Sequence, residues 1–299
     1  MARVRYGPRT EAEIQAARDA RSVLPDIWST GVVAVWESDP DAVAQVLPAP
    51  LKPAERPLVR VNISQVDIFG SPLGAGSFAV AAQHGAQSGW YPLVMPMTTE
   101  RALIGGREVF GEPKKLGEVS VSREAEDVVA RLGRHGIDFV EVRGRVTGEL
   151  PIPEPVEKVD FYFKFLPAVD GDGFDLDPVL VHCTRNERVR RLEAVAGEVI
   201  LRESAFDPVA DLPVRRLLEI TIGEKTSDQR GRVVERVSAQ ALLPYVHQRY
   251  DDPAQVLDSV PAPAASNSAS SNSAASNSAT ANSDAAPGQA RSATSSSEA

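Results

Sequence analysis

Alternation of apolar and polar residues with a period of two is the feature that most limits the fold of this sequence. Residues 58–69 (LVRVNISQVDIF) alternate in this way, and the pattern returns at residues 139–146 and 160–169. Residues 30–36 (TGVVAVW) are rich in β-branched and aromatic side chains, which favour strands. Strands with one apolar and one polar face pair readily in antiparallel sheets. The sequence therefore predicts an α+β domain that is mostly antiparallel β, with connecting turns and a few short helices.

The helices are predicted from local signals. Residues 39–46 begin with Asp39 and Pro40, and proline suits the first turn of a helix. Residues 122–132 (SREAEDVVARL) fit either a helix or a loop beside a strand. We expect residues 213–218 to add a short helical turn.

The two ends of the chain differ from its middle. Residues 10–22 are rich in helix formers, and Thr10 with Glu13 three residues later predicts a capping box. Beyond Val260 the sequence contains no Val, Leu, Ile or aromatic residue. Such a segment cannot bury enough apolar area to offset its ordering entropy. We expect an N-terminal helical extension over 1–24, a folded domain over 25–252 and a disordered Ala/Ser/Asn-rich tail over 253–299 that serves as a linker or solubilises the protein.

Composition argues against several classes of protein. The formal net charge of −9 argues against a nucleic-acid partner, because phosphates are bound by Lys and Arg. The single cysteine, Cys183, cannot form an internal disulfide or a cysteine zinc site, which favours a reducing compartment. No apolar run approaches the roughly 18 residues of a membrane span, and the N-terminal residues are polar. We expect a cytoplasmic protein without a membrane or nucleic-acid partner.

The common motifs for metals, nucleotides and serine nucleophiles are missing. The four histidines, His84, His135, His182 and His247, are far apart in sequence and show no metal-ligand spacing. The GAQSG segment around Ser88 is out of step with G-x-S-x-G. Gly74 and Gly76 lack the third glycine of a dinucleotide fingerprint. No metal or cofactor is predicted.

A pair of adjacent lysines is the main candidate for chemistry. Only six of the 32 basic residues are lysine, and Lys114 and Lys115 are neighbours in the segment GEPKKLG. Lysine can lose its proton and attack a carbonyl, whereas arginine stays protonated. An amine nucleophile needs a lowered pKa, from burial or from a second ammonium nearby. Taken alone, the pair also fits a solvated turn, since lysines are mostly exposed.

Residues 105–117 (GGREVFGEPKKLG) resemble the active-site segment of the acetoacetate decarboxylase family, whose pattern is G-R-E-x-x-x-x-P-K-K-L-G. Shorter stretches resemble other parts of the same family in the same order. These stretches are residues 41–51 (DAVAQVLPAPL), 57–60 (PLVR), 163–171 (FKFLPAVDG) and 211–214 (DLPV). The resemblance covers about residues 25–250, and the P-K-K-L-G segment is its most specific part.

The resemblance implies a fold and a mechanism. It implies an antiparallel β-cone or barrel with a few short helices that encloses the site, usually assembled into a homo-oligomer. It also implies that Lys114 is the Schiff-base lysine and that Lys115 lowers its pKa, which is the known activation device of this family. The resulting protonated imine can lose carbon dioxide, or can support aldol cleavage, condensation or dehydration.

Three positions depart from the family pattern where the substrate would bind. Asn62 stands where the family has a glutamate after the L-V-R arginine, and Ser29 stands near the place of an arginine. A gapless count puts Val80 at the place of a second glutamate. Val80 in the pocket would make it more apolar, which favours a longer or less charged substrate.

Other polar residues could compensate for these changes. Glu112, beside the lysines, could transfer protons or simply form a salt bridge with them. Gln83, His84, Gln87 and Tyr91 could form a substitute polar set, although the first three also fit a surface loop.

Two functional hypotheses follow. The first is a Schiff-base carbon–carbon lyase that acts on a small or medium keto acid, with Asn62, Val80 and Glu112 in its substrate site and activity on acetoacetate itself left open. The second is a non-catalytic protein of the same fold that binds a small molecule without covalent trapping. The missing carboxylates favour the second hypothesis, and the retained lysine pair in an arginine-rich chain favours the first.

Overall fold

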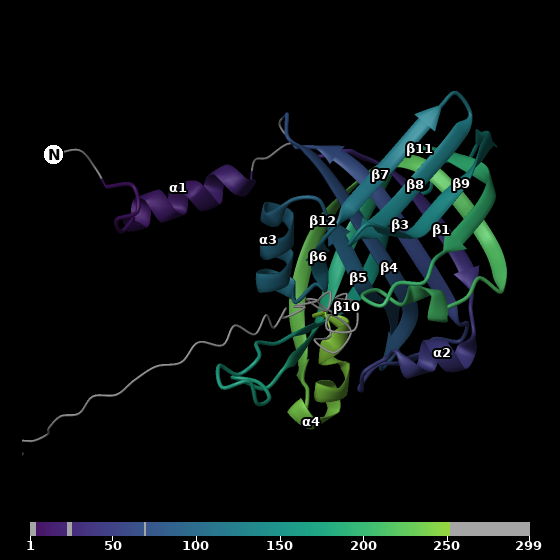
Figure 1. The fold of residues 1–299 in the computed structure, drawn as a ribbon. Coiled ribbons are helices and arrows are strands. Elements are labelled where there is room, and N and C mark those ends of the chain that lie inside the picture. The colour runs from purple at the N-terminus through teal and green to yellow at the C-terminus, as the bar shows by residue number, and fades with distance from the viewer. Residues whose placement is uncertain (1–3, 23–25, 69, 252–299) are drawn as a thin grey trace, which may run out of the picture. The chain divides into compact units, whose positions relative to one another are not determined.

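The computed structural model describes residues 4–22, 26–68 and 70–251, all within one compact unit. This part of the chain contains one 12-stranded sheet with short helices beside it (Figure 1). The strands are β1 (Ser29–Glu37), β2 (Lys52–Pro53), β3 (Leu58–Asp67), β4 (Pro72–His84), β5 (Gln87–Met97), β6 (Lys114–Leu116), β7 (Glu118–Glu124), β8 (Asp127–Arg134), β9 (Ile137–Glu149), β10 (Val156–Lys164), β11 (Val179–Leu201) and β12 (Arg216–Arg236). The α-helices are α1 (Glu11–Ser22), α2 (Pro40–Gln45), α3 (Glu100–Phe110) and α4 (Ala239–Leu242), and the 3-10 helices are η1 (Val209–Asp211) and η2 (Leu243–Gln248). The predicted tail over 253–299 lies outside the described residues.

The sheet closes on itself. Its strand order is β10-β5-β4-β3-β1-β12-β11-β9-β8-β7, and β10 also pairs with β11. This extra pairing joins the strands from β10 to β11 into a ring, so the mostly antiparallel β-barrel prediction is confirmed. Strands β9, β8 and β7 continue the sheet beyond β11, and β7 lies against β3, β4 and β5 outside the ring. The short strands β2 and β6 pair with β4 and β5.

The period-two alternation separates two environments. On β1, Val32, Ala34 and Trp36 are buried in the main hydrophobic core together with side chains of β7, β8 and β9. Residues 29, 31 and 33 of the same strand line a cavity inside the ring. Successive side chains of a strand point to opposite faces, so the predicted polar face turns towards an internal cavity. The main hydrophobic core lies on the outer face of the ring, where β7–β9, α2 and α4 add side chains to it.

Two helix predictions are confirmed in detail. At the start of α1, the backbone N–H of Thr10 donates to Glu13 Oε2 at 2.8 Å and the N–H of Glu13 donates to Thr10 Oγ1 at 3.3 Å, which is the predicted capping box. At the start of α2, Asp39 Oδ1 accepts hydrogen bonds from the N–H groups of Asp41 and Ala42. Pro40 occupies the first turn, as expected.

Two local predictions are wrong, and the helices α3, α4 and η2 were not predicted. Residues 122–132 form parts of the β7–β8 hairpin, because Val128, Ala130 and Leu132 alternate into the core and this burial outweighs local helix propensity. Residues 213–218 lead into β12, and the nearby helical turn is η1. Helix α3 contains two glycines, which weaken the sequence signal for a helix. Among the described residues, no helix is long and apolar enough to cross a membrane.

Candidate active site

The segment that carries the lysines is shaped by the end of α3. Gly111 ends this helix in the left-handed region, with φ of 83°. Its N–H donates to Arg107 O at 3.1 Å, which is the 5→1 bond of the αL motif, and the next N–H, of Glu112, donates to Gly106 O at 3.3 Å. A Cβ at Gly111 would lie 2.7 Å from the Cα of Lys164. Glycine is therefore needed for the turn and for the close approach of β10, and the chain then enters β6.

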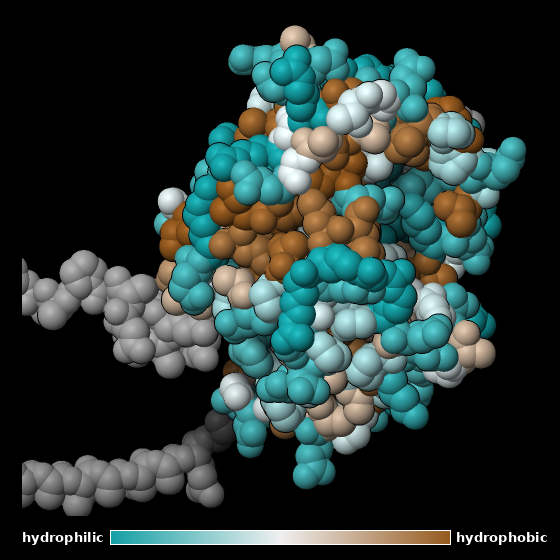
Figure 2. Space-filling view, turned by 90° about the vertical axis from the view of Figure 1, so that its right-hand side faces the viewer, coloured by the Kyte–Doolittle hydropathy of each residue, from teal (hydrophilic) through white to brown (hydrophobic). Residues whose placement is uncertain are grey.

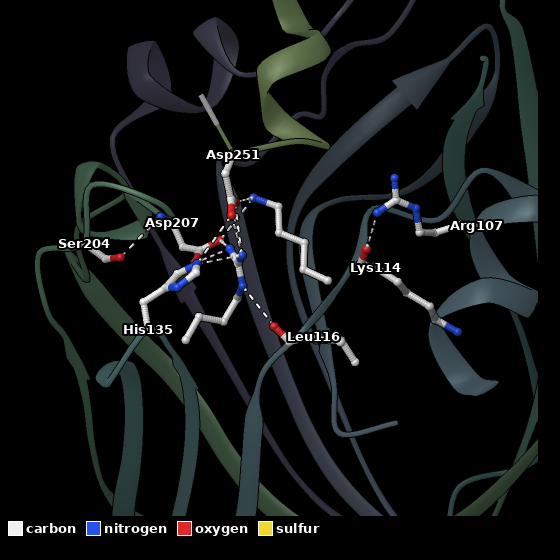
Figure 3. Close-up of polar contacts among 9 residues, drawn as sticks. Arg107, Lys114, Leu116, His135, Ser204, Asp207 and Asp251 are labelled. Carbon is white, nitrogen blue, oxygen red and sulfur yellow. Dashed lines mark hydrogen bonds and ion pairs between the residues drawn. The ribbon is translucent and has the colours of Figure 1, made fainter. Parts of the chain in front are cut away.

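Lys114 projects from β6 into the cavity. Strand β6 runs parallel to β5, with Lys114 opposite Met95. The ammonium Nζ of Lys114 lies 2.7 Å from Glu112 Oε2 and donates to Ala102 O at 3.1 Å. The backbone carbonyl of Lys114 accepts a hydrogen bond from Arg107 Nη1 at 3.2 Å (Figure 3). Only 15% of the Lys114 side chain is exposed.

Lys115 points to the other face of β6, because successive residues of a strand alternate. Its Nζ lies 3.4 Å from Asp207 Oδ1 and 3.1 Å from Asp251 Oδ1, and both carboxylates are also bound by Arg134. Figure 3 shows Asp207 and Asp251 grouped on one side of the strand, with the Lys114 side chain directed away from them. The structure does not bring the two ammonium groups together. The expected role of Lys115 beside the Lys114 amine is therefore corrected: Lys115 belongs to a buried ion cluster.

The charges of this ion cluster are mutually compensated. We define the cluster as Lys115, Arg134, Asp207 and Asp251. Burial alone would raise the pKa of Asp251, but hydrogen bonds from Arg134 and Lys115 outweigh it and lower the pKa to about 2. Burial would likewise lower the pKa of Arg134, and its contacts with Asp251 and Asp207 raise it instead. Asp251 and Arg134 therefore stay ionised at neutral pH.

Glu112 is held in a polar network beside Lys114. Its side chain is 1% exposed, and Oε1 accepts hydrogen bonds from Arg185 Nη2 at 3.1 Å and Gln229 Nε2 at 2.8 Å. Arg185 also donates to Asp160 Oδ2 at 2.7 Å and to the hydroxyl of Tyr162 at 2.9 Å. Burial would raise the pKa of Asp160, but Arg60 and Arg185 hold it below its usual value. Four residues of three strands thus fix the position of Glu112.

The cavity enclosed by the ring has a volume of about 580 Å³. Asn62 and Glu112, which we expect in the substrate site, line it, and so does Ser29. Val80 does not: it is fully buried in the hydrophobic core, on the opposite face of β4 from the cavity-lining Ser77. The structure therefore corrects the placement of Val80 and the expectation of a more apolar pocket that rested on it.

The proposed substitute polar set lies elsewhere. Tyr91 donates a hydrogen bond to Gln248 Oε1, and burial raises its pKa far above the usual value. His84 contacts His182 and Glu235, outside the cavity lining. Gln83 and Gln87 bond to backbone carbonyls of their own hairpin. None of the four residues lines the cavity.

The sequence reasoning missed several charged residues of the cavity. Arg60, Lys158, Glu187 and Lys225 all line it, in addition to Asp160 and Arg185. The scarcity of lysine in the sequence could have pointed to some of these residues, because three of the six lysines line this cavity. The single cysteine is not a second nucleophile, since burial raises the pKa of Cys183 to about 11. Across the described part of the chain, no group of three or more His, Cys, Asp and Glu side chains is placed to hold a metal ion.

Gly106 makes room for the Lys114–Glu112 pair. A Cβ at Gly106 would lie 1.9 Å from Glu112 Oε2 and 2.6 Å from Lys114 Nζ, whereas a Cβ at Gly105 would meet nothing within 4 Å. Glu112 cannot move freely because Arg185 and Gln229 hold its other oxygen. We expect Gly106→Ala to slow reductive trapping of Lys114 by a keto acid and borohydride about 10- to 100-fold, since displacement by 1 Å can cost that much. Gly105→Ala is the matched control, and equal rates for the two variants would contradict the steric argument.

Comparison with known proteins places the chain in a family. The sequence model of the acetoacetate decarboxylase family matches residues 5–238. The acetoacetate decarboxylase of Burkholderia vietnamiensis is 27% identical over 200 residues, which is 63% of this chain and 78% of the relative. That of Burkholderia multivorans is 29% identical over 202 residues, with the same shares covered.

Solved structures share the fold. Acetoacetate decarboxylase from Legionella pneumophila matches with a TM-score of 0.60 at 20% identity, covering 71% of this chain and 86% of that one. MppR, an enduracididine biosynthesis enzyme solved with the condensation product of pyruvate and imidazole 4-carboxaldehyde, matches with a TM-score of 0.59 at 16% identity, covering 72% and 92%. The family match spans most of the chain, and these structures have its β architecture. The chain belongs to the acetoacetate decarboxylase family.

Proposed function

We propose that this protein is a carbon–carbon lyase of the acetoacetate decarboxylase type, in which Lys114 forms a Schiff base with a keto acid. One observation carries the proposal: Lys114 lines the cavity, and its ammonium lies 2.7 Å from the buried carboxylate of Glu112. A lysine, a carboxylate within proton-transfer distance and a cavity for the substrate are the parts that imine chemistry requires.

The proposed reaction begins with transfer of the ammonium proton of Lys114 to Glu112. The neutral amine attacks the ketone carbon, and loss of water, with a proton returned by Glu112, gives a protonated imine. When a carboxylate is attached to the carbon beside the former ketone, the bond to that carboxylate breaks and carbon dioxide leaves. The bonding electron pair moves into the imine, which becomes a neutral enamine. Protonation of the enamine carbon and addition of water release the ketone product and the free amine.

The residues around Glu112 support this proton transfer. Arg185 and Gln229 donate to one oxygen of Glu112, which leaves the other directed at Lys114. Burial raises the pKa of Tyr162, so its hydroxyl stays neutral beside Arg185. In this proposal, Arg185 is a positioning residue that acts through Glu112. Asn62, Ser29 and Ser77 supply neutral polar groups to the cavity.

We further propose that the protein works as a cytoplasmic homo-oligomer. Figure 2 shows hydrophobic residues gathered on one face of the molecule, the side on which β9 is drawn in Figure 1, with hydrophilic residues around them. Exposed apolar areas of this kind are typical of protein–protein contacts. Light scattering on the purified protein would give the number of subunits.

The test is the mass of the intact protein after borohydride reduction with acetoacetate, pyruvate and longer keto acids. We expect an adduct of one substrate mass, and peptide mapping should place it on Lys114. The non-catalytic alternative predicts that these acids bind and leave no adduct. A folded protein that binds a keto acid and is never trapped would overturn the lyase proposal.

A further inference from the structure

A second basic group lies in the same cavity as Lys114. Lys225 on β12 and Lys158 on β10 both contact Glu187 on β11, with Nζ–Oε distances of 3.4 Å and 2.5 Å. Arg60 on β3 also lines the cavity and forms an ion pair with Asp160 at 3.3 Å. We call Lys225, Lys158 and Arg60 the second basic group. The ion pairs that these three residues form do not involve Lys114 or Glu112.

The basic side chains of the cavity outnumber the carboxylates that contact them. The basic set is Arg60, Lys114, Lys158, Arg185 and Lys225. Their carboxylate partners are Glu112, Asp160 and Glu187. Two further carboxylates line the cavity: Glu224 pairs with Arg190 and Arg191, and the exposed Glu219 is in register with Arg60 through Val35, roughly 20 Å from Lys225 along β12. At the end of the cavity around Glu187, the two ammonium groups of Lys158 and Lys225 face one carboxylate, so this end has an excess of one positive charge.

Of these three residues, Lys225 has the positive charge that nearby carboxylates compensate least. Burial lowers its pKa to about 8, and Lys158 and Arg60 nearby lower it as well, against the opposing effect of Glu187. Glu187 is shared, because the shorter of its two contacts goes to Lys158. An anion placed beside Lys225 would therefore stabilise its charged form.

We propose that the second basic group binds a carboxylate remote from the reacting ketone, so that the substrate is a dicarboxylic 3-oxo acid. This inference rests on the proposed Schiff-base function of Lys114. The protonated imine keeps the positive charge of Lys114 beside one carboxylate of the substrate, and a second carboxylate matches the excess charge around Glu187. A monocarboxylic acid would leave this excess charge without a partner.

The size of the cavity agrees with a longer substrate. A volume of about 580 Å³ falls in the range that holds drug-sized ligands, well beyond a four-carbon keto acid. The charged lining replaces the expectation of a less charged substrate, which depended on Val80. A longer and more highly charged acid satisfies both the volume and the charge.

The first test uses ligands that cannot form an imine. Calorimetry should show that glutarate, with two carboxylates, binds at least about tenfold more tightly than butyrate, with one. Lys225→Met should abolish this preference, and it should fold, because Glu187 keeps its contact with Lys158. The matched control is Lys52→Met, which removes an exposed lysine outside the cavity and should keep the preference. Equal binding of the two acids by the wild type, or an unchanged preference in Lys225→Met, would overturn the proposal.

The pH dependence provides an independent readout. The groups that face Lys225 are Glu187, Lys158 and Arg60. Since its pKa is about 8, Lys225 is charged at pH 7 and mostly neutral at pH 9, so glutarate affinity should fall about tenfold over this range. Lys225→Arg stays charged and should remove most of the fall. An identical fall in Lys225→Arg would assign the titration to another group and count against the proposal.

The second test joins the subsite to the reaction. Borohydride trapping should favour 3-oxoadipate over 3-oxohexanoate, which differ only in the terminal carboxylate, and Lys225→Met should remove the difference. If no keto acid is trapped while glutarate binds as expected, the Schiff-base function fails and the anion subsite stands. If both acids are trapped equally well, the subsite fails and the Schiff-base function stands.

Discussion

Lys114→Arg is expected to abolish turnover of every keto acid, by a factor of about 10⁴ or more, while the protein stays folded. Arginine keeps the positive charge and can still pair with Glu112, so the charge balance of the cavity is preserved. A guanidinium does not lose its proton at accessible pH and cannot attack a carbonyl. The measurement is kcat with the best-trapped acid, together with thermal unfolding of both proteins.

Lys115→Arg is the control for this experiment, because it makes the same change at the next residue. Lys115 lies on the other face of β6, and an arginine there can still pair with Asp207 and Asp251. We expect its turnover to stay close to that of the wild type. If Lys115→Arg were as inactive as Lys114→Arg, the two lysines would act together, and the structural separation of their roles would be wrong.

Much of the fold could be predicted from the sequence because strand alternation is a local property. The alternation over 58–69 predicted β3, and the β-branched and aromatic residues of 30–36 predicted β1. The capping box of Thr10 and Glu13 formed as its spacing indicated. The structure of residues 122–132 was harder to predict, since their helix propensity opposes the strand that buries alternate residues. This burial depends on strands far away in sequence.

The residues of the candidate site that the sequence indicated come from the lysine segment and from two positions, Asn62 and Ser29, where the chain departs from the family pattern. Glu112 and Lys114 come from one short segment, and their contact could be anticipated. Lys225 and Glu187 could not, because their proximity depends on the pairing of β11 with β12 and on the closure of the ring by β10. Alternation shows that a strand has a polar face, and it does not show whether that face meets solvent or an internal cavity.

The wrong predictions for Val80 and Lys115 have the same physical cause. Val80 was assigned to the pocket by counting along β4, and Lys115 was assigned to Lys114 by adjacency on β6. In a strand, a shift of one position, or of three, reverses the face to which a side chain points. Val80 accordingly lies in the core and Lys115 in the ion cluster, while Ser77 and Lys114 face the cavity.

Asp207→Asn is expected to destabilise the protein by about 3–5 kcal/mol, the usual result of breaking a buried ion pair. Asp207 is 1% exposed and receives two hydrogen bonds of 2.8 Å from Arg134, besides its contact with Lys115. Without this carboxylate, two buried cations would share Asp251, which is only partly buried. For a domain of this size, such a loss lowers Tm by roughly 6–20 °C.

The matched control is Glu198→Gln, which removes one carboxylate from an exposed pair. Arg143 and Glu198 are both more than half exposed, and pairs of this kind contribute about 0–1 kcal/mol. Calorimetric unfolding of the two variants should therefore differ clearly, with the large shift confined to Asp207→Asn. Equal shifts would mean that the ion cluster does not hold β6 in place. If Asp207→Asn has a much lower Tm and its Lys114 is still trapped by keto acids, the ion cluster stabilises the fold. The chemistry then depends on Lys114, on the other face of β6.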